Sequence, residues 1–263
     1  MSLTLTPLQG FPLVYPGNDL ASLILTSLEN NHISLEDGDI LVVAQKIVSK
    51  SENRLVNLED VEPSPEACEL AVRAEKDPRL VEVILQESRA VLRCRPGTII
   101  VEHRLGFVCA SAGVDQSNAS LDPGLEQDSA VFPSAQWVLL LPEDPDASAQ
   151  RLRGRFEAAS GKRLGVLIID SHGRAWRLGV VGTAIGLAGL PALVDLRGQS
   201  DLFGYQLKIT LVAAADELAA AASLVMGQAA EGTPVVHVRG FPYQLRQSAL
   251  QELLRPRESD LFR

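Results

Sequence analysis

The 263-residue sequence has few cysteines, few aromatic residues and fewer basic than acidic side chains. Its three cysteines are an odd number and form no C-x-x-C pair, so neither a disulfide framework nor a zinc knuckle is predicted, and a reducing compartment is expected. Lys and Arg total 24 against 33 Asp and Glu, a net charge of −9. This balance argues against wide nucleic-acid contacts, because those need clustered basic residues.

Long apolar runs are also missing. Each apolar stretch is broken by Gly, Pro or a charged residue before it reaches the roughly 18 to 20 residues needed to span a bilayer. Residues 1–10 have no basic flank followed by a continuous apolar core, so no signal peptide is predicted. We therefore expect a soluble, cytoplasmic protein with no membrane partner.

Several common catalytic motifs are absent. The string nearest to a Walker A loop, residues 154–163, has the wrong glycine spacing and ends in Arg163 where Ser or Thr is required. No G-x-G-x-x-G follows an expected strand, and there is no H-E-x-x-H or G-x-S-x-G. A glycine cluster with another spacing fits close packing and tight turns as well as it fits binding: Gly179, Gly182, Gly186 and Gly189.

Helical and strand patterns alternate along the chain. Helices are predicted at residues 19–30, at 144–161 and 216–230, and within a charge-rich stretch at 63–93 that Pro78 divides into two. Strands are predicted at residues 39–44, 97–102, 107–110, 137–141, 164–170 and 234–238. This order predicts a mixed α/β or α+β domain. The polar stretch 121–133 is predicted to be a loop between subdomains, and residues 246–263 a tail with one short helix after a domain at 1–245.

Two polar segments follow expected strands. Residues 44–51 carry two lysines and two serines, whose ammonium and hydroxyl donors suit phosphate oxygens; the alternative is a solvated loop. Residues 112–119 bring Asp, Ser and Asn together after a glycine, which suits a hard cation beside a nucleotide; the alternative is an Asx-turn or helix cap.

Two further segments have catalytic composition. Asp170 is predicted at the carboxyl end of a buried strand, a usual place for a metal ligand, with Ser171 beside it and Arg174 and Arg177 available for an anionic substrate. The alternative is a turn Asp with surface arginines. Residues 226–233 form a predicted helix end before a strand, and a simple glycine C-cap is the favoured alternative there.

Eight strings that include these segments occur in a fixed order: IVSKSENR (47–54), ESRAVLR (87–93), GVDQSN (113–118), LPEDPDASA (141–149), IDSHGRAWRLG (169–179), TAIGLAGL (183–190), DLRGQSDLFGYQL (195–207) and ADELAAAASLVMGQAAEGTPVVHVRG (215–240). Together they resemble the coenzyme F420-0:L-glutamate ligases, also called gamma-glutamyl ligases or the CofE family. The order and spacing match over about nine-tenths of the chain, up to about Gly240.

The resemblance implies a two-lobed α+β fold without a Rossmann or P-loop motif, and a homodimer. It implies an acid–amino-acid ligase that uses GTP with Mg²⁺ or Mn²⁺ at two sites, and often K⁺. Such ligases phosphorylate the carboxylate of a phospholactyl deazaflavin, F420-0, and couple L-glutamate to it, releasing GDP and phosphate; further γ-linked glutamates can follow. Phosphoryl transfer of this kind needs charge neutralisation rather than a protein nucleophile, so no nucleophile is assigned.

The resemblance also assigns roles to individual positions. Metal ligands are expected at Asp115, Asp170, Ser171 and Gln228. Nucleotide contacts are expected at Gly10, Phe11, Pro12, Leu13, Gln45, Lys50, Asn118, Met226, Gly227, Gln228, Ala229, Ala230, Glu231, Gly232 and Thr233.

Three departures from the family pattern bear on the acceptor substrate. Residues 181–183 lack the Asp common in relatives, His172 replaces a more usual Thr, and residues 209–211 lack an expected Glu. One alternative is therefore a metal-dependent amide ligase or kinase with another phosphorylated carboxylate acceptor. Another is a non-catalytic nucleotide- or flavin-binding relative, although a degenerate scaffold is expected to lose metal ligands first.

Overall fold

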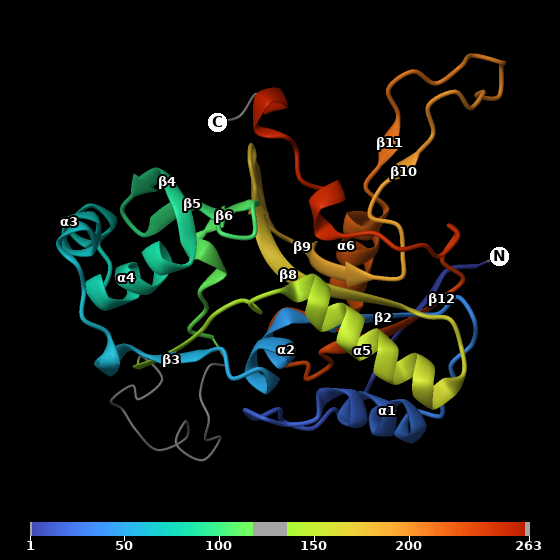
Figure 1. Ribbon diagram of the computed structural model, residues 1–263, viewed down its shortest axis with the longest axis horizontal. Helices are drawn as coiled ribbons and strands as arrows, with labels where there is room; N and C mark the ends of the chain where they lie inside the picture. The colour runs from blue at the N-terminus through green and yellow to red at the C-terminus, as the bar shows by residue number, and fades with distance from the viewer. Residues whose placement is uncertain (1, 118–135, 261–263) are drawn as a thin grey trace. The chain divides into compact units, whose positions relative to one another are not determined.

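The computed structural model describes residues 2–117 and 136–260 (Figure 1). The chain divides into two compact units, and each is described by itself. Unit 1 comprises Met1–Leu13, Asp19–Ile47 and Asp144–Pro256, and unit 2 comprises Val14–Asn18, Val48–Glu143 and Arg257–Arg263. Helices and strands are mixed in several sheets, which confirms the α+β prediction. The predicted loop at 121–133 lies outside the described residues.

A five-stranded sheet forms the centre of unit 1. Its order is β1 (Thr4–Pro7), β12 (Val235–Arg239), β2 (Ile40–Ala44), β8 (Gly165–Arg174) and β9 (Arg177–Ala188). β2 and β8 are parallel, and every other neighbouring pair is antiparallel. β2 reads ILVVA and its first four residues are buried, as expected of a strand with both faces covered.

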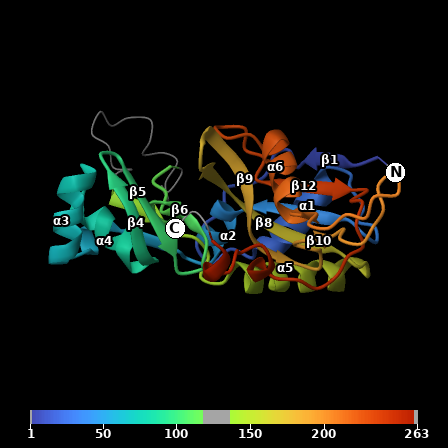
Figure 2. The same ribbon diagram turned by 90° about the horizontal axis from the view of Figure 1, so that it is seen from above.

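Helices cover both faces of this sheet. α1 (Leu20–Asn30) and α5 (Pro145–Ser160) lie on one face and α6 (Ala214–Met226) on the other (Figure 2). The caps explain where two of the helices begin. Asp19 accepts a hydrogen bond from the Ser22 N–H, and Asp144 accepts one from Ala147 just before Pro145. The predictions for β2, α1 and α5 are therefore confirmed to within one residue.

Glycines in and just after β9 let the helices on both faces approach the sheet. A Cβ on Gly182 would lie 2.4 Å from the Ala219 carbonyl oxygen of α6, and one on Gly186 would lie 2.4 Å from Pro145 Cβ of α5. Gly189 similarly abuts the Leu164 carbonyl. The close-packing interpretation is thus confirmed for these three glycines.

Unit 2 is built on a three-stranded antiparallel sheet, β4 (Ser88–Arg95), β5 (Thr98–His103) and β6 (Val108–Ala110). Helices α3 (Pro65–Ala74) and α4 (Pro78–Gln86) pack their buried residues into the same core. A second pair of strands, β3 (Leu55–Asn57) and β7 (Trp137–Leu139), lies antiparallel. Pro78 does divide two helices, but the helical interpretation of residues 88–93 is wrong. That stretch is β4, whose exposed residues and two register shifts conceal any alternation.

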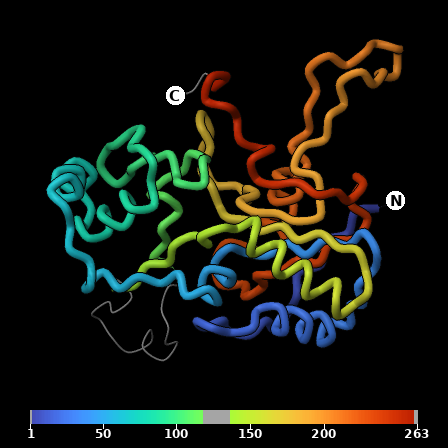
Figure 3. Tube along the Cα trace, viewed as in Figure 1, coloured from blue at the N-terminus to red at the C-terminus, as the bar shows by residue number. Residues whose placement is uncertain are grey.

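One connection differs from the loop alternative, and another was not predicted. Residues 45–51 form helix α2 (Gln45–Ser51), so the solvated-loop alternative is wrong there: Gln45 and Ser49 are buried. β10 (Val194–Asp195) and β11 (Leu211–Val212) pair at the base of an extended segment, residues 196–210, which we call the arm (Figure 3). The tail contains two single 3₁₀ turns, Leu250–Glu252 and Arg257–Ser259.

Within residues 2–117 and 136–260, no helix is long and apolar enough to cross a membrane.

Candidate functional site

At one end of the five-stranded sheet of unit 1, the ends of β1, β2 and β12 lie beside Ile169 in the middle of β8. Ala44, the last residue of β2, pairs with Ile169 of β8, and its N–H donates to the Pro234 carbonyl just before β12 at 2.8 Å. The Leu8 N–H, just after β1, donates to the Val235 carbonyl at 2.9 Å. We call this end, defined by Leu8, Ala44, Ile169 and Val235, the site end of the sheet.

The site end collects every predicted site segment that belongs to unit 1. Residues 10–13 follow β1, Gln45 follows β2, Asp170 and Ser171 follow the buried part of β8, and residues 226–233 precede β12. Carboxyl ends of parallel strands are common places for ligand sites. The topology therefore brings together segments that lie far apart in the sequence.

Ser171 and Gln228 are in direct contact there. The Ser171 hydroxyl donates to Gln228 Oε1 at 2.7 Å, and Gln228 Nε2 donates to Ser223 Oγ at 2.7 Å. Ser223 is buried on α6, while Ser171 and Gln228 are exposed. The amide of Gln228 is thus held between a strand hydroxyl and a helix hydroxyl.

Asp170 faces the other side of the β8–β9 hairpin. It pairs with Thr183, whereas Ser171 pairs with Gly182, and successive side chains of a strand alternate between faces. Asp170 Oδ2 lies 3.1 Å from Nε2 of the buried His172. The sequence placed Asp170 at a strand end or turn, which is wrong: β8 continues to Arg174. The apolar signal stops at Ile169 because the remaining residues lie on a largely exposed hairpin.

The loop between α6 and β12 is shaped by its own side chains. α6 ends at Gly227, which has φ 79°, so a glycine C-cap is present as the favoured alternative predicted. The Glu231 carboxylate accepts a hydrogen bond from the Ala229 N–H at 2.8 Å, and this bond lowers the pKa of Glu231. The Thr233 hydroxyl donates to the Met226 carbonyl at 2.8 Å. Gln228, Ala229 and Ala230 are left exposed on the loop surface.

The remaining predicted residues of unit 1 vary in exposure. Gln45 is buried, Phe11 is half-buried, and Gly10, Pro12 and Leu13 are exposed. Arg174 and Arg177 pair at the tip of the β8–β9 hairpin, where Arg174 donates to the Leu178 carbonyl.

Three predicted residues belong to unit 2. Lys50 lies in the last turn of α2 and is half-buried. The Asp115 backbone bridges that of Leu139 through bonds of 3.0 and 2.8 Å, and its carboxylate accepts from the Ser117 N–H at 2.7 Å. The Asx-turn alternative is therefore present at Asp115. Asn118 lies outside the described residues.

The side-chain oxygen atoms of Ser171 and Gln228 are suitable ligands for a hard divalent cation. In residues 2–117 and 136–260 no group of three or more His, Cys, Asp or Glu side chains is placed to hold a metal ion. Mg²⁺, however, takes oxygen ligands of any kind and few carboxylates, because phosphates and water complete its shell. Adjacent ligands of an octahedral Mg²⁺ lie about 2.9 Å apart. A hydrogen bond holds Ser171 Oγ and Gln228 Oε1 2.7 Å apart, so both oxygen atoms can contact one cation once the serine proton turns away.

Ser223 is the residue at the site end that sequence reasoning missed. It lies in an Ala-rich helix, where a single serine has no distinctive spacing. The sequence could have indicated Ser223 only through its position on the buried face of α6, five residues before Gln228. His172 was noted as a departure, but its contact with Asp170 was not foreseen.

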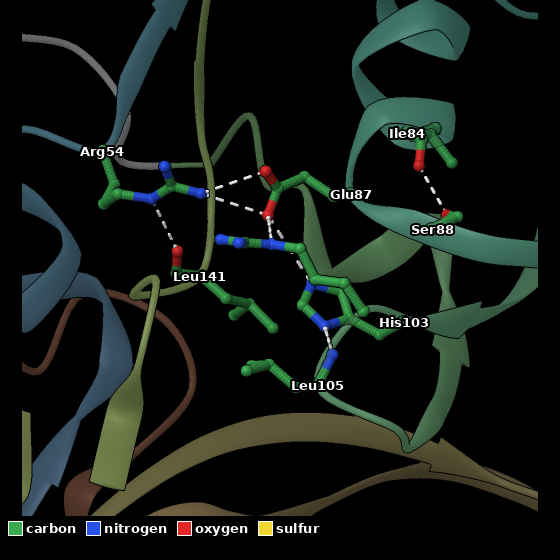
Figure 4. Close-up of polar contacts among 8 residues, drawn as sticks. Arg54, Ile84, Glu87, Ser88, His103, Leu105 and Leu141 are labelled. Atoms are coloured by element: carbon green, nitrogen blue, oxygen red, sulfur yellow. Dashed lines mark hydrogen bonds and ion pairs between the residues drawn. The ribbon is translucent and has the colours of Figure 1, made fainter. Parts of the chain in front are cut away.

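Unit 2 contains a buried charge cluster centred on Glu87 (Figure 4). Arg54 Nη2 donates to both carboxylate oxygens at 3.1 Å, and Arg104 Nε donates to Oε2 at 2.9 Å. His103 Nε2 lies 3.7 Å from Oε2. Burial would raise the pKa of Glu87, but the His103 contact and the charges of Arg54 and Arg104 outweigh it and lower the pKa to about 2.

This cluster predicts acid sensitivity. Since its pKa is lowered on folding, Glu87 contributes stability at pH values above its ordinary pKa of 4.5, and this stability is lost as pH falls toward about 2. Glu87→Gln is expected to lower the free energy of unfolding by about 2 kcal/mol at pH 7, because it removes the charge paired with two arginines. Urea unfolding between pH 2 and 7 should show that acidification lowers the free energy of unfolding less in E87Q than in the wild type.

Glu69→Gln on the exposed side of α3 makes the same chemical change and is the control. Equal acid sensitivity in E87Q and the wild type would contradict the assignment.

Comparison with known proteins identifies the family. The family model described as F420-0:Gamma-glutamyl ligase matches residues 10–240. The chain is 48% identical to the coenzyme F420:L-glutamate ligase of Methanothermobacter thermautotrophicus over the whole of both chains. It is 49% identical to that of Methanopyrus kandleri over 95% of this chain and 93% of the relative, and 40% identical to that of Archaeoglobus fulgidus over 100% and 97%.

These matches place the chain among the ligases, enzymes that join two molecules by a new covalent bond. It belongs to the F420-0:gamma-glutamyl ligase family, which confirms the resemblance found in its motifs.

Proposed function

We propose that the chain is a GTP-dependent ligase that phosphorylates the carboxylate of F420-0 and couples L-glutamate to it, releasing GDP and phosphate. The observation that carries this proposal is the 48% identity, over the full length of both chains, to a coenzyme F420:L-glutamate ligase. The gathering of the predicted nucleotide and metal segments of unit 1 at the site end supports it.

The proposed reaction has two bond exchanges. A carboxylate oxygen of F420-0 bonds to the γ-phosphorus of GTP as the bond from that phosphorus to the bridging oxygen breaks, and GDP leaves. The amine nitrogen of L-glutamate then bonds to the acyl carbon, the bond from that carbon to the phosphate oxygen breaks, and the amine gives a proton to water. A further γ-linked glutamate would require a second activation.

The residues of the site end would bind and position the nucleotide. Residues 10–13 and the loop 226–233 would contact it, and buried Gln45 would fix its position. Ser171 and Gln228 would hold one Mg²⁺ or Mn²⁺ and Asp170, on the other side of the hairpin, would contribute to a second, with K⁺ as a further cation. These cations would neutralise phosphate charge as it shifts during transfer. In unit 2, Lys50 and Asn118 are proposed nucleotide contacts and Asp115 a metal ligand.

Phosphate release tests the proposal. Wild-type enzyme with GTP, Mg²⁺ or Mn²⁺ and L-glutamate is expected to release phosphate only when F420-0 is added, and the product mass should rise by glutamyl units. GTP binding without release would favour a binding protein. Release with another carboxylate but not with F420-0 would favour a different acceptor.

We also propose that the enzyme is a homodimer. The arm carries large apolar side chains that are almost fully exposed: Leu202 is 98% exposed, Phe203 95% and Ile209 87%. Contiguous exposed apolar side chains commonly mark interaction surfaces. The paired substitution Leu202→Asp with Phe203→Asp is expected to yield a monomer of about 28.3 kDa in sedimentation equilibrium, whereas the wild type is expected at twice that mass.

Val72→Asp is the control, because Val72 is exposed on α3 of unit 2; this variant should remain dimeric. A dimeric arm variant, or a monomeric wild type, would contradict this assignment.

A further inference from the structure

We propose that Ser223 is a positioning residue that orients the Gln228 amide, so that its carbonyl oxygen and the Ser171 hydroxyl form two adjacent ligands for a divalent cation. This inference rests on the proposed function, which assigns a cation to Ser171 and Gln228. Neither the family motifs nor the resemblance gives Ser223 a role. Its evidence is a chain of two hydrogen bonds that links α6, the loop 226–233 and β8.

The orientation of the amide decides what the site can bind. With Nε2 donating to Ser223 Oγ, Oε1 lies 2.7 Å from Ser171 Oγ, and two oxygen atoms stand side by side. If the amide were rotated by a half turn, its NH₂ group would stand beside Ser171 instead. An NH₂ group is a donor with no acceptor capacity, so it cannot bind a cation. A serine hydroxyl can donate as well as accept, so Ser223 does not exclude the rotated amide by itself. It accepts the Nε2 proton in the orientation in which Oε1 faces the cation, and so acts on the cation through Gln228.

The position of Ser223 is fixed by the packing of α6 on β9. A Cβ on Gly182 would lie 2.5 Å from Ser223 Cβ and 2.4 Å from the Ala219 carbonyl oxygen. Gly182 is also the residue paired with Ser171 across the hairpin. The absent side chain at Gly182 thus lets α6 approach closely enough for Ser223 to reach the amide beside Ser171.

The backbone at Gln228 is held by other contacts. Glu231 accepts from the Ala229 N–H, Thr233 donates to the Met226 carbonyl, and the Gly227 N–H donates to the Ser223 carbonyl through the main chain. None of these bonds uses the Ser223 hydroxyl. Ser223→Ala should therefore release the amide while leaving the loop in place. Outer-shell partners of metal ligands act in this way, and their loss typically costs 10- to 100-fold in affinity.

Mn²⁺ binding measured by electron paramagnetic resonance, with and without GDP, tests the inference on the full-length protein. Ser223→Ala is expected to weaken Mn²⁺ binding about tenfold, and thermal unfolding should show that it folds. Ser160→Ala is the matched control: it removes a half-buried hydroxyl that donates to the Phe156 carbonyl in the last turn of α5, which leads into the opposite end of β8. It should bind Mn²⁺ as the wild type does.

A double-mutant cycle separates positioning from a general structural effect. Gln228→Ala is expected to weaken Mn²⁺ binding at least as much as S223A, and S223A should add nothing in the Q228A background. Wild-type affinity in S223A would overturn the inference, and so would full additivity of the two losses. Absence of Mn²⁺ binding by the wild type under both conditions would overturn it as well.

The proposed function can fail separately. If the wild type binds Mn²⁺ and the cycle behaves as expected, but no phosphate is released with F420-0 and L-glutamate, the positioning role stands and the ligase reaction does not. If phosphate release depends on both substrates while S223A binds Mn²⁺ as the wild type does, the ligase reaction stands and the positioning role fails.

Discussion

Asp170→Asn is expected to lower turnover more than about 100-fold while leaving the fold intact. Asn keeps the size of Asp170 but removes the charge proposed to hold a cation at the site end. Since loss of an outer-shell partner costs 10- to 100-fold, loss of a charged ligand should exceed that range. The measurement is steady-state phosphate release with GTP, F420-0 and L-glutamate, at Mg²⁺ concentrations raised until no further increase occurs.

Glu29→Gln gives the matched control, because it makes the same carboxylate-to-amide change on an exposed turn of α1 in the same unit. It is expected to turn over at the wild-type rate. Activity of D170N within a few-fold of the wild type would show that Asp170 holds no essential cation, and its contact with His172 would then be its main role.

Gly186→Ala is expected to destabilise the protein by about 3 kcal/mol. The added Cβ would lie 2.4 to 2.7 Å from Pro145 Cβ and from the Pro145 carbonyl carbon and oxygen. These atoms belong to the first turn of α5 and to a rigid ring, so they cannot move aside without shifting the helix on the sheet. For a chain of this size we expect the melting temperature to fall by about 5 to 10 °C.

Gly154→Ala should not destabilise the protein, in contrast to Gly186→Ala. Gly154 lies within α5, has no atom within 4 Å of the position of a Cβ, and is exposed. Ala is favoured over Gly in a helix by up to about 1 kcal/mol, so this variant should be as stable as the wild type or slightly more so. Melting curves of the two variants make the comparison. Equal melting temperatures for the two variants would show that the packing of α5 against β9 does not require a residue without a side chain at position 186.

The elements that the sequence predicts well are those whose signal is local. β2 is a continuous apolar run, and α5 has both an Asp-Pro start and a glycine end. β4 and the outer part of β8 were missed because most of their residues are exposed, and strand pairing is then decided by a distant partner. The pairing of β1 with β12 joins the two ends of unit 1, and no local pattern reports it.

The same reasoning applies to the site. Composition alone left each segment open, and the family resemblance selected the residues. What the sequence could not show is that residues 10–13, Gln45, Asp170 and the loop 226–233 adjoin the same end of the sheet. This follows from the pairing of Ala44 with Ile169 and from the bonds to the Pro234 and Val235 carbonyls. The opposite facing of Asp170 and Ser171 follows from the continuation of β8.

The chain order of the two units has a consequence for synthesis. Most of unit 2 lies in sequence between β2 and β8, and β1 must wait for β12 before it gains a partner. On the ribosome, residues 48–143 can therefore fold while β1 and β2 are still unpaired. During that interval the apolar strand ILVVA lacks both of its neighbours, β8 and β12, so we expect the nascent chain to be prone to aggregation until these strands emerge.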